Sequence, residues 1–469
     1  MSGSAPDWAA LQHGISGEVL LPGSDGYERA RTPFIAGFAD LEPQAVVRCA
    51  APEDVVEVIA VARRRGIHTA TRSGGHSFAG YSSTTGIVID VTPMHSVVAA
   101  NGVAQVGAGA RLGEMYERLL ADGVTVPSGT CPSVGIGGIT LGGGHGILGR
   151  SYGLTLDHLL GAQVVLADGH VAECDERHHA DLLWALRGAG AGHLGVVTAF
   201  TFRTRPASSM TNFRLVWPQA HAAATVAAWQ RWAPYGPDAL VADLTLSVTG
   251  DLGAGLQAEV CGAMLGSERE ACTLLDDLVS RAGSDPSAGS YTEMSFLDTI
   301  RYQAGAGGPD GQPGPPAPGQ VAGRGFRFTK SGFFDRPLPG EAVAALVGSL
   351  TRQPRPGQDR SVVLAPWGGA YSRQTPDATA FAHRDQLFLL EHLALLPPDA
   401  SVPDQRAAHD WMRGSWDTVG AWASGRVYPN FPDPGLQDWG RAYHGENHPR
   451  LLDVKARYDP DGVFRSRNH

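Results

Sequence analysis

The hydrophobic and polar positions of the first 200 residues predict short helices and strands in turn. Apolar residues spaced three and four apart predict helices over residues 52–66, 111–123 and 180–190. Apolar runs rich in β-branched residues predict strands over residues 67–72, 86–91, 102–109, 162–169 and 195–204. Residues 126–149 are so rich in glycine that we expect neither helix nor packed strand there, and instead a backbone that closely approaches a flat or phosphorylated ligand.

The pattern changes after about residue 208. Strand-like runs over residues 213–217, 239–248 and 256–265 alternate with segments over 268–283 and 379–396 that we expect to be helical. This order predicts an α+β domain built on an antiparallel sheet. We therefore expect three parts: residues 1–207, residues 208–415, and residues 416–469 as a segment that returns to the first part. Residues 305–325, which are rich in glycine and proline, are expected to form a mobile excursion.

Composition excludes several classes of protein. The 469 residues are 43% hydrophobic and 18% charged, which is typical of a folded globular chain. A net charge of −10 with 37 scattered basic residues predicts no nucleic-acid partner. No apolar run approaches the roughly 18 to 20 residues of a spanning helix, and the N-terminus lacks a secretory signal, so we expect a cytoplasmic protein with no membrane partner. Five separated cysteines predict no disulfide framework, and the oligomeric state is left open.

Two short motifs are weak matches to known sites. Residues 190–195 match GxGxxG, but a dinucleotide site needs a strand before the glycines and a helix after them, and here the predicted order is reversed. Residues 149–153 match GxSxG without a strand that ends at the serine, which argues against a hydrolase. His178 and His179 are read as surface residues, and Cys174 as a small buried side chain. No metal site is expected.

Glycine-rich loops that carry possible nucleophiles are the strongest signal. Residues 72–77 read Arg-Ser-Gly-Gly-His-Ser, and residues 130–138 carry Cys131 within a similar loop. A third glycine run spans residues 141–146. Successive backbone N–H groups in such loops bind anions and suit a pyrophosphate. On residue chemistry alone, the alternative that His76 is a turn residue and Cys131 a buried thiol stays open.

These motifs resemble the bicovalent flavin oxidases of the berberine bridge enzyme-like group, within the vanillyl-alcohol oxidase type of FAD-binding fold. The similarity continues through residues 152–157, 181–188, 195–197, 428–430, 443–447 and 450–460, so it covers nearly the whole chain. The resemblance implies a PCMH-type FAD-binding domain and a second domain over the flavin ring. It also implies that FAD is covalently bonded to His76 at the 8α methyl group and to Cys131 at carbon 6.

Carried over position by position, the resemblance implies a set of site residues. Those expected to bind the cofactor are Arg72, Ser73, Gly74, Gly75, His76, Ser77, Thr130, Cys131, Val134, Gly137, Gly138, Gly142, Gly143, His145, Gly195, Val196, Tyr428 and Asn430. Tyr428 is the predicted general base, and Tyr371 is a second candidate. The sequence departs from the family pattern at His193, Phe431 and His444, which places the substrate contacts in question.

We therefore expect an oxidase that moves a hydride from a CH–OH or similar carbon to FAD. Val134 occupies the position that controls access of O₂ in enzymes of this kind, so O₂ is expected to reoxidise the flavin and give H₂O₂. The substrate is expected to be a small molecule, either a natural-product intermediate or a carbohydrate. The alternative is a flavin-dependent cyclase, rearrangement or oxygenation catalyst, which the same fold permits.

Overall fold

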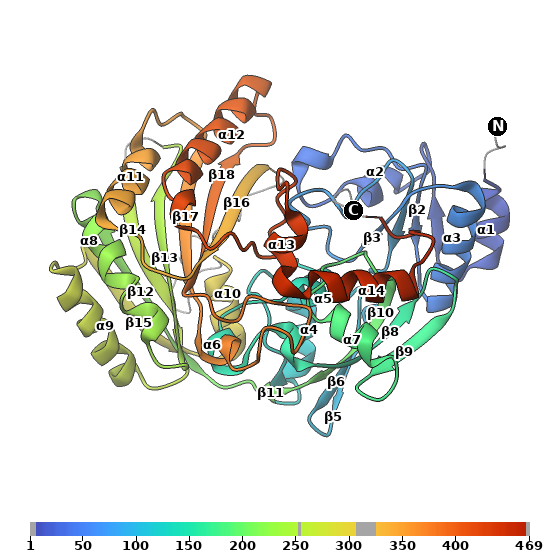
Figure 1. Cartoon of the computed structure of the whole chain (residues 1–469), viewed down its shortest axis with the longest axis horizontal. Coiled ribbons are helices and arrows are strands. Elements are labelled where there is room, and N and C mark those ends of the chain that lie inside the picture. Colours follow the sequence, from blue (N-terminus) through green and yellow to red (C-terminus); the bar gives the residue numbers. More distant parts are fainter. Residues whose placement is uncertain (1–5, 252–254, 306–324, 466–469) are drawn as a thin grey trace.

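The computed structural model describes residues 6–251, 255–305 and 325–465. Two sheets lie in the first half of the chain (Figure 1). One has the order β1-β2-β4-β3 and consists of Glu18–Leu20, Ala45–Arg48, Ile87–Asp90 and Thr69–Arg72. The other has the order β5-β6-β10-β8-β9 and consists of Val97–Ala100, Val103–Gly107, Val196–Arg203, Leu159–Val165 and Val171–Asp175. A short pair joins β7 (Val124–Thr125) to β11 (Arg205–Pro206).

Seven helices accompany these sheets in the described part of the first half. They are α1 (Trp8–Gly14), α2 (Tyr27–Arg31), α3 (Pro52–Arg65), α4 (Leu112–Leu120), α5 (Ile136–Gly142), α6 (Gly149–Tyr152) and α7 (Ala180–Leu186). The helices predicted over residues 52–66, 111–123 and 180–190 correspond to α3, α4 and α7. Helix α3 begins with Pro52 and ends at Gly66 in a left-handed conformation, so its boundaries were readable from the sequence.

A seven-stranded sheet dominates the second half (Figure 1). Its order is β15-β12-β14-β13-β17-β18-β16, and every neighbouring pair is antiparallel. The strands are β12 (Met210–Pro218), β13 (Leu240–Val248), β14 (Gln257–Met264), β15 (Ala288–Met294), β16 (Phe326–Phe334), β17 (Asp359–Pro366) and β18 (Phe388–Leu396). Helices α8 (Gln219–Trp229), α9 (Glu268–Ala282), α11 (Gly340–Thr351) and α12 (Val402–Asp417) cover its outer face, and α10 (Phe296–Gln303) lies near β12. The expected α+β class with an antiparallel second domain is confirmed.

The helix predicted over residues 379–396 is wrong. Residues 388–396 form β18, and residues 379–387 form the turn that leads into it. Every residue of β18 is buried, because the strand lies inside the sheet and is paired with β17 and β16. A continuous apolar run shows the same periodicity in a fully buried strand as in a buried helix, so the pattern misidentified this segment.

The expectation that residues 126–149 contain no helix is also wrong. Helix α5 spans Ile136–Gly142, and Ile136 and Leu141 are buried in the core of the first half. A Cβ atom on Gly137 would lie 2.9 Å from the carbonyl oxygen of Ala108. The glycines therefore let this helix pack closely against its neighbours, and that packing outweighs their low helix propensity.

The C-terminal residues lie along the first half of the chain (Figure 1). Helix α13 spans Trp439–His444, and α14 spans His448–Tyr458 and contacts α7. Asp181 on α7 accepts hydrogen bonds from Arg457 at 2.5 Å and from Tyr458 at 2.8 Å. The three boundaries expected from the sequence stay predictions. Most of the predicted mobile excursion, residues 306–324, lies outside the described residues.

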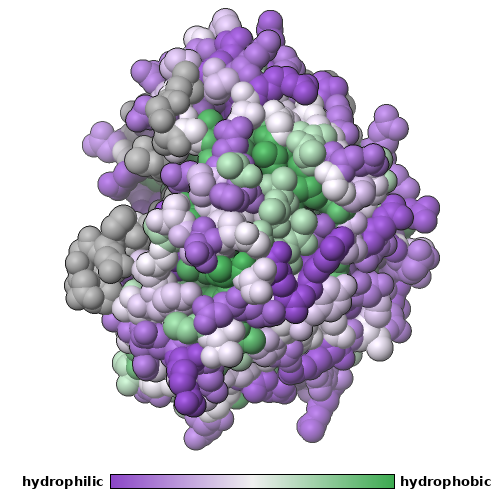
Figure 2. All heavy atoms as spheres, turned by 90° about the vertical axis from the view of Figure 1, so that its left-hand side faces the viewer, coloured by the Kyte–Doolittle hydropathy of each residue, from purple (hydrophilic) through white to green (hydrophobic). Residues whose placement is uncertain are grey.

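The end of the molecule that carries the seven-stranded sheet is largely hydrophilic, with apolar side chains gathered in the upper half of the view in Figure 2. Among the described residues, no helix is both long and apolar enough to span a membrane.

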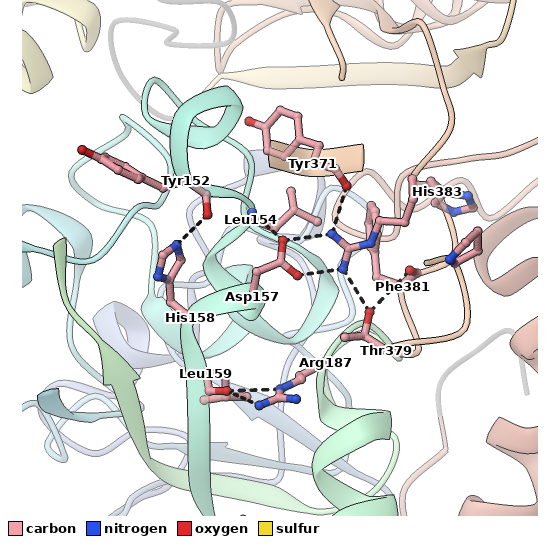
Figure 3. Close-up of polar contacts among 12 residues, drawn as sticks. Tyr152, Leu154, Asp157, His158, Leu159, Arg187, Tyr371, Thr379, Phe381 and His383 are labelled. Carbon is pink, nitrogen blue, oxygen red and sulfur yellow. Dashed lines mark hydrogen bonds and ion pairs between the residues drawn. The ribbon is translucent and has the colours of Figure 1, made fainter. Parts of the chain in front are cut away.

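A buried ion pair fixes two distant segments against each other (Figure 3). Both nitrogens at the end of the Arg384 guanidinium donate to the carboxylate of Asp157, at 2.8 and 2.9 Å. Their side chains are 1% and 5% exposed. Arg384 also donates to the carbonyl oxygen of Tyr371 at 3.3 Å. The pair therefore joins the segment after α6 to the turn before β18.

We expect Asp157→Asn to lower the free energy of unfolding by about 3–5 kcal/mol, because the substitution leaves the buried Arg384 without its counter-charge. Urea denaturation followed by tryptophan fluorescence measures this loss. The matched control is Asp181→Asn, whose partner Arg457 is 69% exposed, and which should cost about 1 kcal/mol or less. Equal effects of the two substitutions would contradict the structural importance of the buried pair.

Candidate active site

Two glycine-rich loops cross with their backbones in contact. The loop of residues 72–77 follows β3, and the loop of residues 130–138 leads into α5. A Cβ atom on Gly74 would lie 2.2 Å from the backbone nitrogen of Gly135. A Cβ atom on Gly135 would lie 2.1 Å from Oγ of Ser73. Any larger side chain at these two positions would push the loops apart, so the glycines are needed for close approach.

The crossing places the two predicted nucleophiles on either side of one hydroxyl group. Oγ of Ser133 lies 3.1 Å from Nε2 of His76 and 3.4 Å from Sγ of Cys131. The imidazole of His76 stacks on Phe34 with ring centroids 3.8 Å apart. Burial, assisted by the nearby Arg111 and Arg327, lowers the pKa of His76 to about 4. The imidazole is therefore neutral at pH 7 and has a free electron pair for bond formation.

The first loop offers a row of backbone donors. The N–H groups of residues 74–78 donate to no acceptor among the described residues, and all five residues line one large cavity. Successive free N–H groups form a concave site for an anion such as a pyrophosphate. The cavity has a volume of about 720 Å³ and runs between the glycine-rich loops and the seven-stranded sheet. These residues therefore fit a bound FAD: a nest of donors, two nucleophiles and a long cavity.

Most of the residues predicted for the site line this cavity. They are Ser73, Gly74, Gly75, His76, Ser77, Thr130, Cys131, Val134, Gly137, Gly138, His145, Gly195, Tyr371, Tyr428 and Asn430. Phe431 and His193, where the sequence departs from the family pattern, line it as well.

Four predicted residues lie behind the cavity wall. Arg72 donates to the carbonyl oxygens of Ser82 and Arg31 and to the hydroxyl of Ser83, so its guanidinium supports the first loop from behind. Val196 is a fully buried residue of β10, and its neighbour Val197 faces the cavity instead.

Gly142 and Gly143 make room for the C-terminal segment. A Cβ atom on Gly142 would lie 2.2 Å from Oδ1 of Asn430, and one on Gly143 would lie 2.7 Å from the ring of Tyr428. The resemblance assigned both glycines to the cofactor, and that assignment stays a prediction; in the structure they make room for Asn430 and Tyr428.

Tyr428 is held by three donors. Its hydroxyl oxygen accepts hydrogen bonds from the backbone N–H of Gly144 at 2.7 Å and of His145 at 3.2 Å, and from Nδ2 of Asn430 at 3.1 Å. Burial raises the pKa of Tyr428, and these three hydrogen bonds oppose that shift. Nδ2 of Asn430 also donates to the carbonyl oxygen of Ile139 at 2.9 Å, so Asn430 fixes Tyr428 to the middle of α5.

The second phenol lies beside the first. The hydroxyl of Tyr371 is 3.3 Å from both the nitrogen and the oxygen of Gly146, and burial raises its pKa. Its ring stacks on Trp367 with centroids 4.4 Å apart. His145 faces the ring of Tyr428 edge-on at 5.2 Å, and burial lowers the pKa of His145 to about 4. Whether Tyr428 or Tyr371 is the base stays a prediction of the sequence.

Asp243 is a charged cavity residue that was not among the predicted site residues. Asp243 on β13 lines the cavity and makes no hydrogen bond or ion pair with any described residue. Burial raises its pKa to about 7. The signal was present in the sequence, because Asp243 is the single charged residue in the strand-like run of residues 239–248.

The weak motifs do not form the dinucleotide or hydrolase sites that their patterns would suggest. Residues 190–195 connect helix α7 to strand β10, the reverse of a dinucleotide-binding turn. Ser151 lies inside α6 and donates to the carbonyl oxygen of Asp238 at 2.9 Å. His178 is paired with Asp175 at the surface, and Cys174 is buried with its pKa raised to about 12.

Comparisons with known proteins agree with this site. A family profile described as "FAD binding domain" matches residues 43–175, and one described as "Berberine and berberine like" matches residues 427–468. The FAD-linked oxidoreductase YgaK of Bacillus subtilis is 32% identical over 462 residues, 96% of either chain. Chitooligosaccharide oxidase of Gibberella zeae is 30% identical over 91% of this chain and 86% of that protein. The structure of glucooligosaccharide oxidase from Acremonium strictum matches with a TM-score of 0.84 at 27% identity over 97% of each chain.

Fold and site together define an FAD-dependent oxidoreductase. The chain belongs to the berberine bridge enzyme-like family, whose members similar to this chain include oxidases of oligosaccharides. The resemblance stated from the sequence motifs is thereby confirmed.

Proposed function

We propose that this chain bonds FAD twice, through His76 and Cys131, and uses it to oxidise a CH–OH carbon with O₂ as electron acceptor. The observation that carries this proposal is the contact of one hydroxyl, that of Ser133, with both nucleophiles. This shared contact supports one flavin bonded to both residues. The similar glucooligosaccharide oxidase is described as carrying 6-S-cysteinyl, 8α-N1-histidyl FAD, which uses the same two residue types.

The residues of this chain have distinct tasks toward the cofactor. When bound, FAD accepts a hydride from the substrate carbon and passes two electrons to O₂, which leaves as H₂O₂. The free N–H groups of residues 74–78 would bind the pyrophosphate. In the tautomer whose Nε2–H donates to Oγ of Ser133, the electron pair of Nδ1 is available for the bond to the flavin.

Val134 supports the assignment of O₂ as acceptor. It lies three residues after Cys131, lines the cavity, and follows a turn in which its N–H donates to the carbonyl oxygen of Cys131 at 3.3 Å. A valine side chain is short and stiff about χ1, so it leaves space that a leucine would fill.

The relatives indicate the chemical class of the substrate. Because similar proteins act on oligosaccharides, we propose a carbohydrate or a related polyhydroxylated natural product as substrate. The alternative is a redox-neutral cyclisation or rearrangement. Peroxide stoichiometry separates the two, because an oxidase releases one H₂O₂ per product and a redox-neutral catalyst releases none.

FAD should remain attached to the protein when the protein is denatured. Acid precipitation should leave the yellow colour with the protein, and mass analysis of peptides should find one flavin that joins the peptides of His76 and Cys131. His76→Ala and Cys131→Ala should each retain one bond, and only the double variant should release flavin. Cys272→Ala is the matched control, since this thiol lies on α9 away from the cavity, and it should retain both bonds. Flavin in the supernatant of the wild-type protein would overturn the proposal.

The reduced flavin should react directly with O₂. After anaerobic reduction, the flavin should reoxidise on mixing with aerated buffer and give one H₂O₂ per flavin. Val134→Leu should slow this step about tenfold, equivalent to about 1.4 kcal/mol of barrier, because the added carbon fills the space for O₂. Val98→Leu, at a position 63% exposed, serves as the control and should not slow it. A wild-type flavin that stays reduced in air while an artificial dye reoxidises it would identify a dehydrogenase.

A further inference from the structure

The inner face of the seven-stranded sheet forms one wall of the cavity. In β13, Ala242 and Leu244 belong to the core between the sheet and its outer helices. Side chains alternate between the two faces of a strand, so Val241 and Asp243 point to the opposite face. Both line the cavity, as does Cys261, which lies directly opposite Asp243 on β14. The partial exposure of Asp243 is therefore exposure to the cavity interior.

Asp243 differs from the other acids on this side of the sheet. Glu391 forms an ion pair with Arg327 at 3.0 Å, and Glu259 forms one with Arg214 at 2.7 Å. Both carboxylates are thereby neutralised. Asp243 has neither an ion pair nor a hydrogen bond within the described part of the chain. A carboxyl group inside a protein without a partner carries an energetic cost, which indicates a role toward a ligand.

We propose that Asp243 is a catalytic residue whose carboxylate accepts the hydroxyl proton of the substrate as the CH–OH carbon is oxidised. This assignment rests on the proposed function. In the step, the substrate O–H bond breaks and its proton moves to the carboxylate. The O–H electron pair forms the second bond of the carbonyl group, while the C–H bond breaks and its electron pair leaves with the hydride. The proton then passes to solvent before the next turnover.

The other ionisable side chains nearby are poorly matched to this task. Burial raises the pKa of Tyr428 and of Tyr371, which disfavours the phenolate form that a base requires. The lowered pKa of His145, about 4, makes it too weak a base to retain a proton. Asp243 has a pKa of about 7, which suits an acceptor that works near neutral pH.

The surroundings of Asp243 explain its pKa. The thiol of Cys261 faces it from β14, and the phenol of Tyr371 faces it from the 3₁₀ turn Gly369–Ser372. Glu259 lies at the next inward-facing position of β14 and is paired with Arg214. No cation of the described residues pairs with Asp243, so burial alone acts on its carboxyl.

The kinetic test is anaerobic reduction of the holoenzyme flavin as a function of pH. Glucose, cellobiose, N,N′-diacetylchitobiose and benzyl alcohol are tried as probes, and the fastest reductant is used. In the wild type the rate should rise with pH and level off above about 7, because only the carboxylate accepts a proton. Asp243→Asn should reduce the rate roughly 10²- to 10⁴-fold and abolish the inflection. Asp243→Glu should restore part of the rate together with the inflection.

Two further variants separate the role of Asp243 from a general loss of activity and from a role of Tyr428. Asp276→Asn, on the outer helix α9, is the matched control and should leave rate and pH profile unchanged. Tyr428→Phe, which removes the acceptor of three hydrogen bonds, should lose about tenfold or less and keep the inflection near pH 7. If Asp243→Asn retains the wild-type profile, or if Tyr428→Phe alone removes the inflection, the proposal is overturned and Tyr428 becomes the base.

A second measurement does not depend on turnover. The pKa of Asp243 rises from 3.8 to about 7 on folding, so its ionisation opposes folding, and stability falls as pH increases through this range. The Asp243→Asn variant should therefore melt at a higher temperature than the wild type at pH 8. The difference in melting temperature should be smaller at pH 5. The same difference in melting temperature at both pH values would overturn the proposal. If no probe reduces the wild-type flavin while dithionite does, the proposed function fails, and the melting comparison still reports on Asp243.

Discussion

The backbone contact between Gly74 and Gly135 is the constraint on which the site depends. Neither position has space for a Cβ atom, so the two loops cross closer than any residue with a side chain would permit. This crossing brings His76 and Cys131 to a common neighbour, although they lie far apart in the sequence. The reactive groups are thus positioned by backbone sterics, which hold them more rigidly than side-chain contacts alone would.

The two halves of the chain divide the chemistry between them. The first half supplies backbone donors and nucleophiles, which suit an anionic cofactor. The second half supplies the inner face of a sheet, where side chains at alternate positions face the cavity and are free to vary without disturbing the core beneath them. Asp243 is an example, since Ala242 and Leu244 on either side of it keep β13 anchored to the helices.

Sequence reasoning succeeded where a local pattern has one physical meaning. Helix α3 was found because its periodicity and its terminal residues agree. The cofactor loops and their nucleophiles followed from motif resemblance. Strand β18 was missed because its uniformly apolar run is ambiguous until its two neighbouring strands are known. Arg72 was assigned to the cofactor by the motif resemblance, and its guanidinium donates to the backbone behind the loop, a contact that the motif does not reveal. Asp243 was overlooked because the cavity it faces exists only in three dimensions.

The dependence of the site on the C-terminal segment has a consequence for biosynthesis. Tyr428 and Asn430 fill the space that Gly142 and Gly143 leave open, so they complete a wall begun by residues made much earlier. While the ribosome is still adding the second half, the loops that carry His76 and Cys131 have already emerged, and their cavity lacks this wall. Assembly of the site therefore waits for the end of translation. A chain cut short by premature termination or proteolysis would hold an unfinished cavity, so only full-length molecules offer the cofactor a closed site.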